Sequence, residues 1–231
     1  MKNIILHVLC EGPTEELFVK NVLVPYFNQY SIFIKSQLLH TNKKKEAQGG
    51  VVSYLKIKKE LLLMIDQFVD KESEEHYFTT MIDFYGLPKD TPFISLKKQS
   101  CDKYTIIKSL ENEFANDIKS DKFIPYLQLH EFEALVLCGL DIMIKKFPNA
   151  TSKINQLKKD VDKYSTMELV NDSIHTAPSK RIEAVLQKNY HYNKPKDGIY
   201  IVSRIEFTVL RERCPHFNEW IGKIEGLRMY K

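Results

Sequence analysis

The stretch Cys10-Glu11-Gly12-Pro13-Thr14-Glu15-Glu16 joins two segments of different periodicity. Residues 4–9 form a short apolar run of strand-forming residues, and residues 16–24 carry apolar side chains at helical spacing. A strand, a tight loop and a helix are therefore predicted. Thr14 can cap this helix, and the glutamates of its first turn suit the helix dipole.

Glu11 differs from those two glutamates because it stands at the carboxyl end of the strand. Open α/β sheets place their sites at this edge. Gly12 leaves room there for a ligand or for backbone to come close. The alternative is an ordinary capped helix with a solvated Glu11.

The same alternation continues along the chain. Strands are predicted over residues 31–39 and 77–82, with a long amphipathic helix over 51–69 between them. A helix over 105–118 precedes a fourth strand over 123–129. This order predicts an α/β fold with a parallel sheet flanked by helices.

The domain prediction places the α/β core in residues 1–140. Residues 141–231 are expected to be a mostly helical extension packed on that core, since they are polar and lysine-rich at first and show no clear strand. Two helices broken near Pro215 are expected at the end of the chain.

Composition sets only wide limits on function. The 231 residues are 43% hydrophobic and 28% charged, with a formal net charge of +4. That charge permits a nucleic-acid partner without arguing for one. We expect a cytoplasmic protein with reduced thiols and no membrane segment, because the four cysteines are far apart and no stretch approaches the ~20 apolar residues of a span. The oligomeric state is left open.

Acidic residues follow three of the predicted strands. Glu11 follows the first and Asp83 ends the third, while Glu131 and Glu133 follow the fourth. Because parallel strands end at a common edge, Glu11, Asp83 and one of the later glutamates are expected to converge. Favourable charges at a helix start are the alternative for the later pair. His130 is interpreted as a structural or orienting residue.

Two basic segments are candidates for nucleic-acid binding. The first comprises Lys43, Lys44 and Lys45 in a glycine-bearing loop. The second is the pair Lys180 and Arg181, at the start of a predicted helix, where cations oppose the dipole and are often placed to bind phosphate. A merely solvated surface is the alternative for both.

Five motifs in this order resemble a prokaryotic family of unknown function that is related to the Toprim domains of OLD-type nucleases. The resemblance runs from the N-terminus to about Trp220, and the segments that carry it are residues 11–15, 79–88, 124–135, 176–181 and 214–220.

This resemblance implies a Toprim-like, Rossmann-like sheet with a glutamate after the first strand and an Asp-x-Asp after a later one, which bind divalent metal for phosphodiester chemistry. Glu11 matches that glutamate, Glu15 the second acid of the OLD-type pattern, and Asp83 the first aspartate. Tyr85 departs from the pattern at the second aspartate. Glu131 or Glu133 could replace that ligand; otherwise the site holds one metal ion or none.

The leading hypothesis is therefore a nuclease that depends on Mg²⁺ or Mn²⁺, with Glu11, Asp83 and Lys180 as catalytic residues. Lys180 or Arg181 would steady charge in the transition state. The resemblance implies a possible ABC-class ATPase partner in phage defence, and this chain has no P-loop of its own. The alternatives are a non-catalytic module that binds an ATPase or nucleic acid, and a nucleotidyl or phosphoryl transferase. DNA and RNA substrates are not distinguished.

Overall fold

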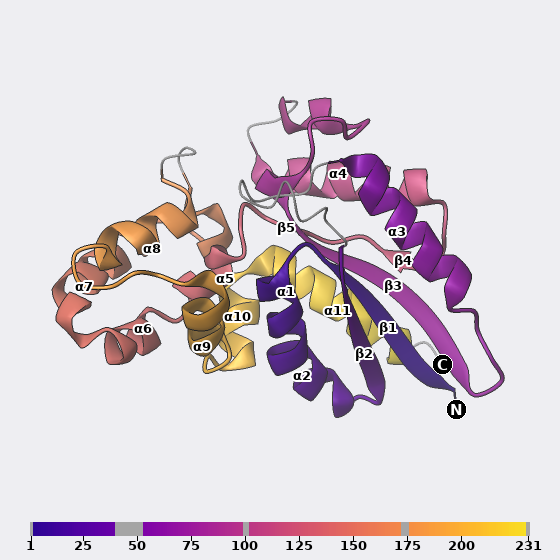
Figure 1. The fold of residues 1–231 in the computed structure, drawn as a ribbon, viewed down its shortest axis with the longest axis horizontal. Coiled ribbons are helices and arrows are strands. Elements are labelled where there is room, and N and C mark those ends of the chain that lie inside the picture. The colour runs from indigo at the N-terminus through magenta and orange to yellow at the C-terminus, as the bar shows by residue number, and fades with distance from the viewer. Residues whose placement is uncertain (1, 40–52, 99–101, 172–175, 230–231) are drawn as a thin grey trace. The chain divides into compact units, whose positions relative to one another are not determined.

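The computed structural model describes residues 2–39, 53–98, 102–171 and 176–229 (Figure 1). The chain divides into two compact units. The first comprises Met1–Gln128 together with Gly222–Lys231, and the second comprises Leu129–Ile221. This division falls earlier than the predicted boundary at residue 140, and it returns the end of the chain to the first unit.

The first unit contains a parallel sheet, as predicted. Its strands are β1 (Asn3–Cys10), β2 (Ile32–Leu38), β3 (Glu74–Asp83) and the short β4 (Phe123–Ile124) and β5 (Leu127–Gln128). The order is β2-β1-β3-β4, with β5 also pairing with β3, and every pairing is parallel. From Ile4 to Cys10 every residue of the central strand β1 is buried, which explains its continuous apolar run.

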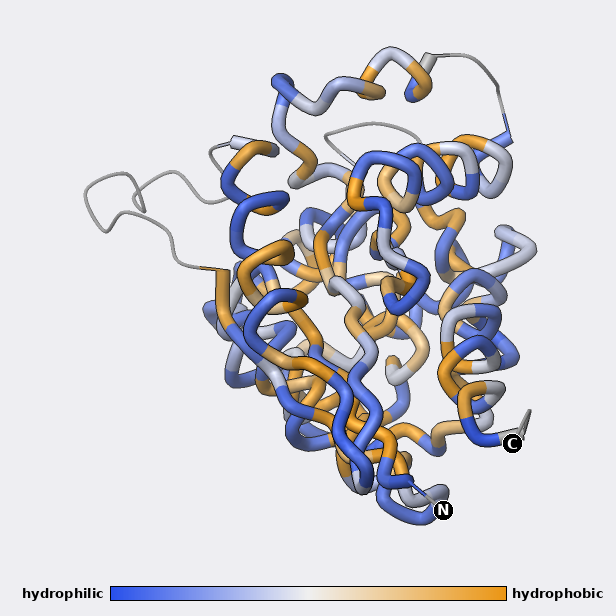
Figure 2. Tube along the Cα trace, turned by 90° about the vertical axis from the view of Figure 1, so that its right-hand side faces the viewer, coloured by the Kyte–Doolittle hydropathy of each residue, from blue (hydrophilic) through white to orange (hydrophobic). Residues whose placement is uncertain are grey.

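Helices lie on both faces of this sheet (Figure 1). On one side are α1 (Pro13–Phe18), a π-helical turn (Val19–Leu23) and α2 (Val24–Asn28); on the other are α3 (Tyr54–Gln67) and α4 (Lys103–Ile118). Figure 2 shows hydrophobic segments along the strands and hydrophilic residues on the outer faces of helices. The core of the unit therefore consists of strand residues covered from both sides.

Helix α1 begins earlier than expected, and the prediction that Thr14 caps it is wrong. The cap position is held by Gly12, whose backbone is extended, and Pro13 is the first helical residue. Proline favours this position because its φ is already helical and its missing N–H needs no partner. Thr14 is consequently a buried residue inside the helix.

The predicted fourth strand is interrupted at Pro125, so that β4 and β5 are two short pieces. Proline cannot donate to a sheet ladder, and other groups satisfy the backbone there. The Thr80 hydroxyl donates to the Tyr126 carbonyl at 2.7 Å, and the buried Glu111 carboxylate of α4 accepts the Leu127 N–H at 2.8 Å.

The described residues of the second unit form helices and turns and no strand. The helices are α5 (Glu133–Leu137), α6 (Leu140–Lys146), α7 (Thr151–Val161), α8 (Pro178–Leu186), α9 (Ile199–Val202), α10 (Phe207–Arg213) and the first part of α11 (Pro215–Met229). Short 3₁₀ turns cover Pro148–Ala150 and Met167–Leu169, and a π-helical turn covers Lys194–Gly198. The mostly helical character expected after the sheet is confirmed, including the break near Pro215.

A buried carboxylate holds the start of α11. Glu168 is fully buried, and its two oxygens each accept one backbone N–H, from His216 and Phe217, both at 2.9 Å. These N–H groups have no partner inside the helix, so the carboxylate satisfies them and complements the dipole. None of the helices in the described ranges is both long and apolar enough to cross a membrane.

Candidate functional site

The loop after β1 and the turn after β3 meet at the carboxyl edge of the sheet. The Glu11 N–H donates to the Met81 carbonyl at 3.0 Å, so β1 and β3 stay paired to this point. The Asp83 N–H then donates to Glu11 Oε2 at 2.9 Å. The carboxylate of the first predicted site residue therefore lies against the backbone of the second, as expected for the ends of neighbouring parallel strands.

A 3₁₀ turn over Phe84–Gly86 packs directly onto the Glu11 carboxylate. A Cβ atom at position 86 would lie 2.7 and 2.8 Å from the two Glu11 carboxylate oxygens. Real Cβ atoms essentially never come so close, so any larger residue at position 86 would force the Glu11 carboxylate to move. The sequence shows a glycine three residues after Asp83. It does not show that this glycine lies against the carboxylate of Glu11.

Lys97 fixes the same turn from the other side. Its Nζ donates to the Phe84 carbonyl at 2.7 Å and lies 4.4 Å from the centroid of the Phe84 ring. Burial lowers the pKa of Lys97 to about 8, because the charged ammonium is poorly solvated there. No sequence pattern singled out Lys97, since its role depends on a contact with a turn 13 residues away.

Glu15 turns back toward the same loop. It lies in the first turn of α1 and is only 4% exposed, and a Cβ at Gly12 would lie 3.1 Å from its Oε2. Burial raises the pKa of Cys10, and the negative charge of Glu15 raises it further. The second acid of the predicted pattern is thus placed next to the end of β1, close in the chain to Glu11.

Tyr85 lies in the 3₁₀ turn two residues after Asp83. Its side chain is 38% exposed, and its ring lies 5.8 Å from that of Phe84. Among the residues that the structure describes, no group of three or more His, Cys, Asp or Glu side chains is arranged to hold a metal ion. Within the first unit, the contact shown at this edge is that of the Glu11 carboxylate with the Asp83 N–H.

Glu131 and Glu133 belong to the second unit, where each has a partner. Glu131 Oε2 accepts the N–H of Ser179, in the first turn of α8, at 3.1 Å. Glu133 is 1% exposed and lies 3.3 Å from Lys194 Nζ. Burial raises the pKa of Glu133, and the attraction of Lys194 opposes that rise. His130, just before them, is buried and has a left-handed backbone with φ 63°.

The cations at the start of α8 also have partners inside the second unit. Lys180 Nζ lies 2.8 Å from Glu183 on the exposed surface of the helix. The Arg181 guanidinium donates to the Thr176 carbonyl at 2.8 Å and to the Tyr164 hydroxyl at 3.0 Å. The Glu131 carboxylate at the helix start offsets the unfavourable placement of these cations. Lys43, Lys44 and Lys45 lie outside the described residues.

Comparison with known proteins identifies one family. No curated protein and no solved structure matches the chain. The model of one family, described as Domain of unknown function (DUF4276), matches residues 10–225. This range runs from the end of β1 into α11 and includes every candidate residue of the sheet edge. The chain therefore belongs to the DUF4276 family.

Proposed function

We propose that this chain is a divalent-metal-dependent nuclease of Toprim type that hydrolyses phosphodiester bonds in DNA or RNA. One observation carries the proposal: Glu11 and Asp83 follow adjacent parallel strands, and the Asp83 N–H holds the Glu11 carboxylate at 2.9 Å. This edge is where open α/β sheets bind their ligands. The resemblance to Toprim domains adds the same two residues as metal ligands.

The donor set fits Mg²⁺ or Mn²⁺. Carboxylate oxygens suit these hard ions, whereas zinc usually takes histidine or cysteine. Mg²⁺ commonly keeps several waters and uses one or two carboxylates together with substrate phosphates, so a preformed cage of three side chains is not required. Glu11 and Asp83 would hold the ion, with Glu15, Glu131 and Glu133 as the further candidates.

A bound ion would neutralise charge on the phosphoryl group and lower the pKa of its water. The chain's own residues supply positioning. The Asp83 N–H orients the Glu11 carboxylate, and the turn fixed by Lys97 limits its motion. Lys180 is proposed to steady transition-state charge. Its exposed pair with Glu183 is worth only ~0–1 kcal/mol and can therefore be exchanged for a phosphate at little cost.

The second candidate is a non-catalytic module that binds nucleic acid or an ABC-class ATPase. An exposed tyrosine at position 85, in place of an acidic ligand, favours it. Under either candidate the family resemblance implies a setting in phage defence. The two candidates differ in one measurable property, cleavage in the presence of metal.

The test compares Glu11→Gln and Asp83→Asn with the wild-type protein, using Mn²⁺ and plasmid, single-stranded DNA and tRNA as substrates. Glu16→Gln is the matched control, because Glu16 lies in the same loop-helix segment but pairs with Lys20 at 2.8 Å. The two site variants should lose cleavage while the control keeps it, with melting temperatures close to wild type. Unchanged cleavage in both site variants would refute the proposed site. A wild-type protein that binds nucleic acid but cleaves none of the substrates would favour the module.

A further inference from the structure

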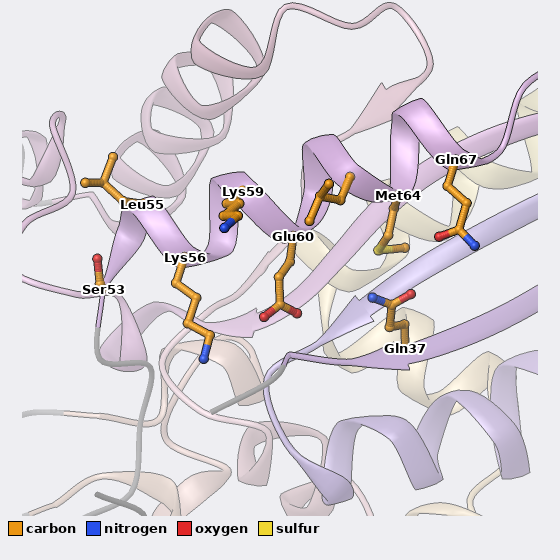
Figure 3. Close-up of a pocket in the computed structure, with 9 residues that line it drawn as sticks. Gln37, Ser53, Leu55, Lys56, Lys59, Glu60, Met64 and Gln67 are labelled. Carbon is orange, nitrogen blue, oxygen red and sulfur yellow. The ribbon is translucent and has the colours of Figure 1, made fainter. Parts of the chain in front are cut away.

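An open pocket lies between the edge strand β2 and helix α3, and we call it the β2–α3 groove. Its volume is about 730 Å³, and it is lined by Gln37, Ser53, Leu55, Lys56, Lys59, Glu60, Leu63, Met64 and Gln67. Figure 3 shows Lys56 and Glu60 extending from α3, and Gln37 reaching from β2 toward the helix. Within the described residues β2 is the last strand on its side of the sheet, with β1 as its neighbour.

The strand side of the groove carries an aromatic residue and a cation. Phe33 and Lys35 alternate with buried residues of β2 and point to the same face as Gln37. This is the α3 face, because Lys35 pairs in register with His7, which stacks on Phe68 just after α3. Phe33 is 44% exposed, although it lies within a strand. The groove floor is therefore continued along β2 by an exposed ring and a positive charge.

The helix side supplies further positive charge. Lys56 and Lys59 both line the groove, and neither forms an ion pair with any residue that the structure describes. One acidic side chain, Glu60, lines it as well. Lys58, the other lysine of α3, is paired with Asp117 at 2.8 Å. The lining of the groove therefore carries two lysines against one glutamate.

One end of the groove lining lies near the ends of β1 and β2. Gln37 pairs in register with Leu9, two residues before Glu11, and Ser53 immediately precedes α3. A chain lying in the groove would therefore pass within a few residues of the ends of β1 and β2. This continuity relates the groove to the candidate site within a single unit.

We propose that the β2–α3 groove binds a single strand of nucleic acid, with phosphates on Lys56 and Lys59 and a base stacked on Phe33. The proposal rests on the proposed function in one respect, namely that the ligand is the nucleic acid whose phosphodiester reaches the Glu11 edge. Proteins that bind single strands combine a basic groove with exposed aromatic rings, and both are present here. A protein partner without acidic residues at this position would have to bury the ammonium groups of Lys56 and Lys59 with no counter-charge. Removing these charges from water in that way is unfavourable.

The test measures the affinity of a fluorescein-labelled 12-nucleotide strand, in DNA and RNA form, by anisotropy over a range of salt concentrations. EDTA and the Glu11→Gln background prevent cleavage during the measurement. Lys56→Gln/Lys59→Gln should weaken binding by about tenfold or more in low salt. The slope of log affinity against log salt should become shallower by about 1.4, since each phosphate contact on a single strand contributes about 0.7.

Two controls make the result specific. Lys71→Gln/Lys119→Gln removes the same charge from exposed positions outside the groove lining and should leave the slope unchanged. Phe33→Leu keeps the apolar character but removes the ring, so it should weaken binding several-fold while leaving the salt slope intact.

Binding that does not depend on Lys56 and Lys59, or no binding by the wild-type protein, would overturn the groove proposal even if cleavage is observed. So would a change of oligomeric state in the groove variants by light scattering with no change in affinity, because the groove would then be an interface between copies. Conversely, groove-dependent binding without any metal-dependent cleavage would support the groove and refute the nuclease.

Discussion

Replacing Gly86 with alanine should disturb the candidate site through a single contact. The added Cβ would lie 2.7 Å from one oxygen of the Glu11 carboxylate, about 0.7 Å short of an ordinary 3.4 Å contact. Gly86 does not have a left-handed backbone, so alanine itself causes no strain at this position. The clash must be relieved by movement of the carboxylate, which is the far end of a flexible side chain.

The same movement weakens the bond from the Asp83 N–H, which is 2.9 Å long. Losing a bond to a charged acceptor costs roughly 1.5–3 kcal/mol when both groups stay buried. Glu11 is only half-buried and can turn to water, so we expect a loss of about 1 kcal/mol, partly offset by the roughly 0.4–1 kcal/mol that Gly→Ala gains from the unfolded chain. The melting temperature should thus change by less than about 4 °C. If Glu11 is catalytic, a displacement of this size should reduce cleavage by on the order of 10²-fold.

The assay pairs thermal melts with Mn²⁺ affinity and cleavage rates. Gly222→Ala is the matched control, since a Cβ there meets nothing within 4 Å, and it should raise stability slightly without changing metal affinity. Adding Glu11→Ala to Gly86→Ala removes the clashing group, so the double variant should be no less stable than Glu11→Ala alone.

Two outcomes would refute the reasoning. If Gly86→Ala leaves both Mn²⁺ affinity and cleavage unchanged in a protein that shows both, the turn does not position Glu11. If the destabilisation persists fully in the double variant, the contact responsible is with some group other than the Glu11 carboxylate.

Three further results are expected. His7 Nε2 lies 3.0 Å from Nδ1 of His76. Burial lowers the pKa of His7 from 6.5 to about 4, and the nearby charges of His76 and Lys35 lower it in the same direction. The folded state therefore binds fewer protons than the unfolded chain between these values, so stability is complete above pH 6.5 and falls by roughly 3 kcal/mol as the pH drops to about 4; urea titrations at several pH values should show this fall, and His7→Phe should flatten it. Glu168→Ala should destabilise the protein by about 2–4 kcal/mol, because two buried backbone donors lose a charged acceptor, whereas a shift below 1 kcal/mol in denaturant titrations would contradict that role. Burial raises the pKa of Cys214, so its thiol should react with iodoacetamide only after unfolding, as mass spectrometry of the native and denatured protein can check.

Local pattern alone was enough to predict the sheet and two residues of its candidate site. The unbroken apolar run of β1 reflects burial on both faces, and the helical spacing after Pro13 reflects one covered face, so both elements could be predicted from neighbouring residues. Glu11 and Asp83 could be placed at one edge because parallel strands share an end. These are consequences of periodicity and topology, which a sequence carries directly.

Tertiary structure decided the contacts that join residues far apart in the chain. Glu111 could satisfy the break at Pro125 only once α4 lay beside the sheet, and Gly86 could approach Glu11 only after β1 and β3 had paired. Lys97 acquires its lowered pKa from burial against a turn that no spacing rule connects to it. The sequence by itself thus determines which faces are buried and where strands end, whereas packing determines which polar groups meet, because hydrogen bonds and desolvation act over a few ångströms in space whatever the separation along the chain.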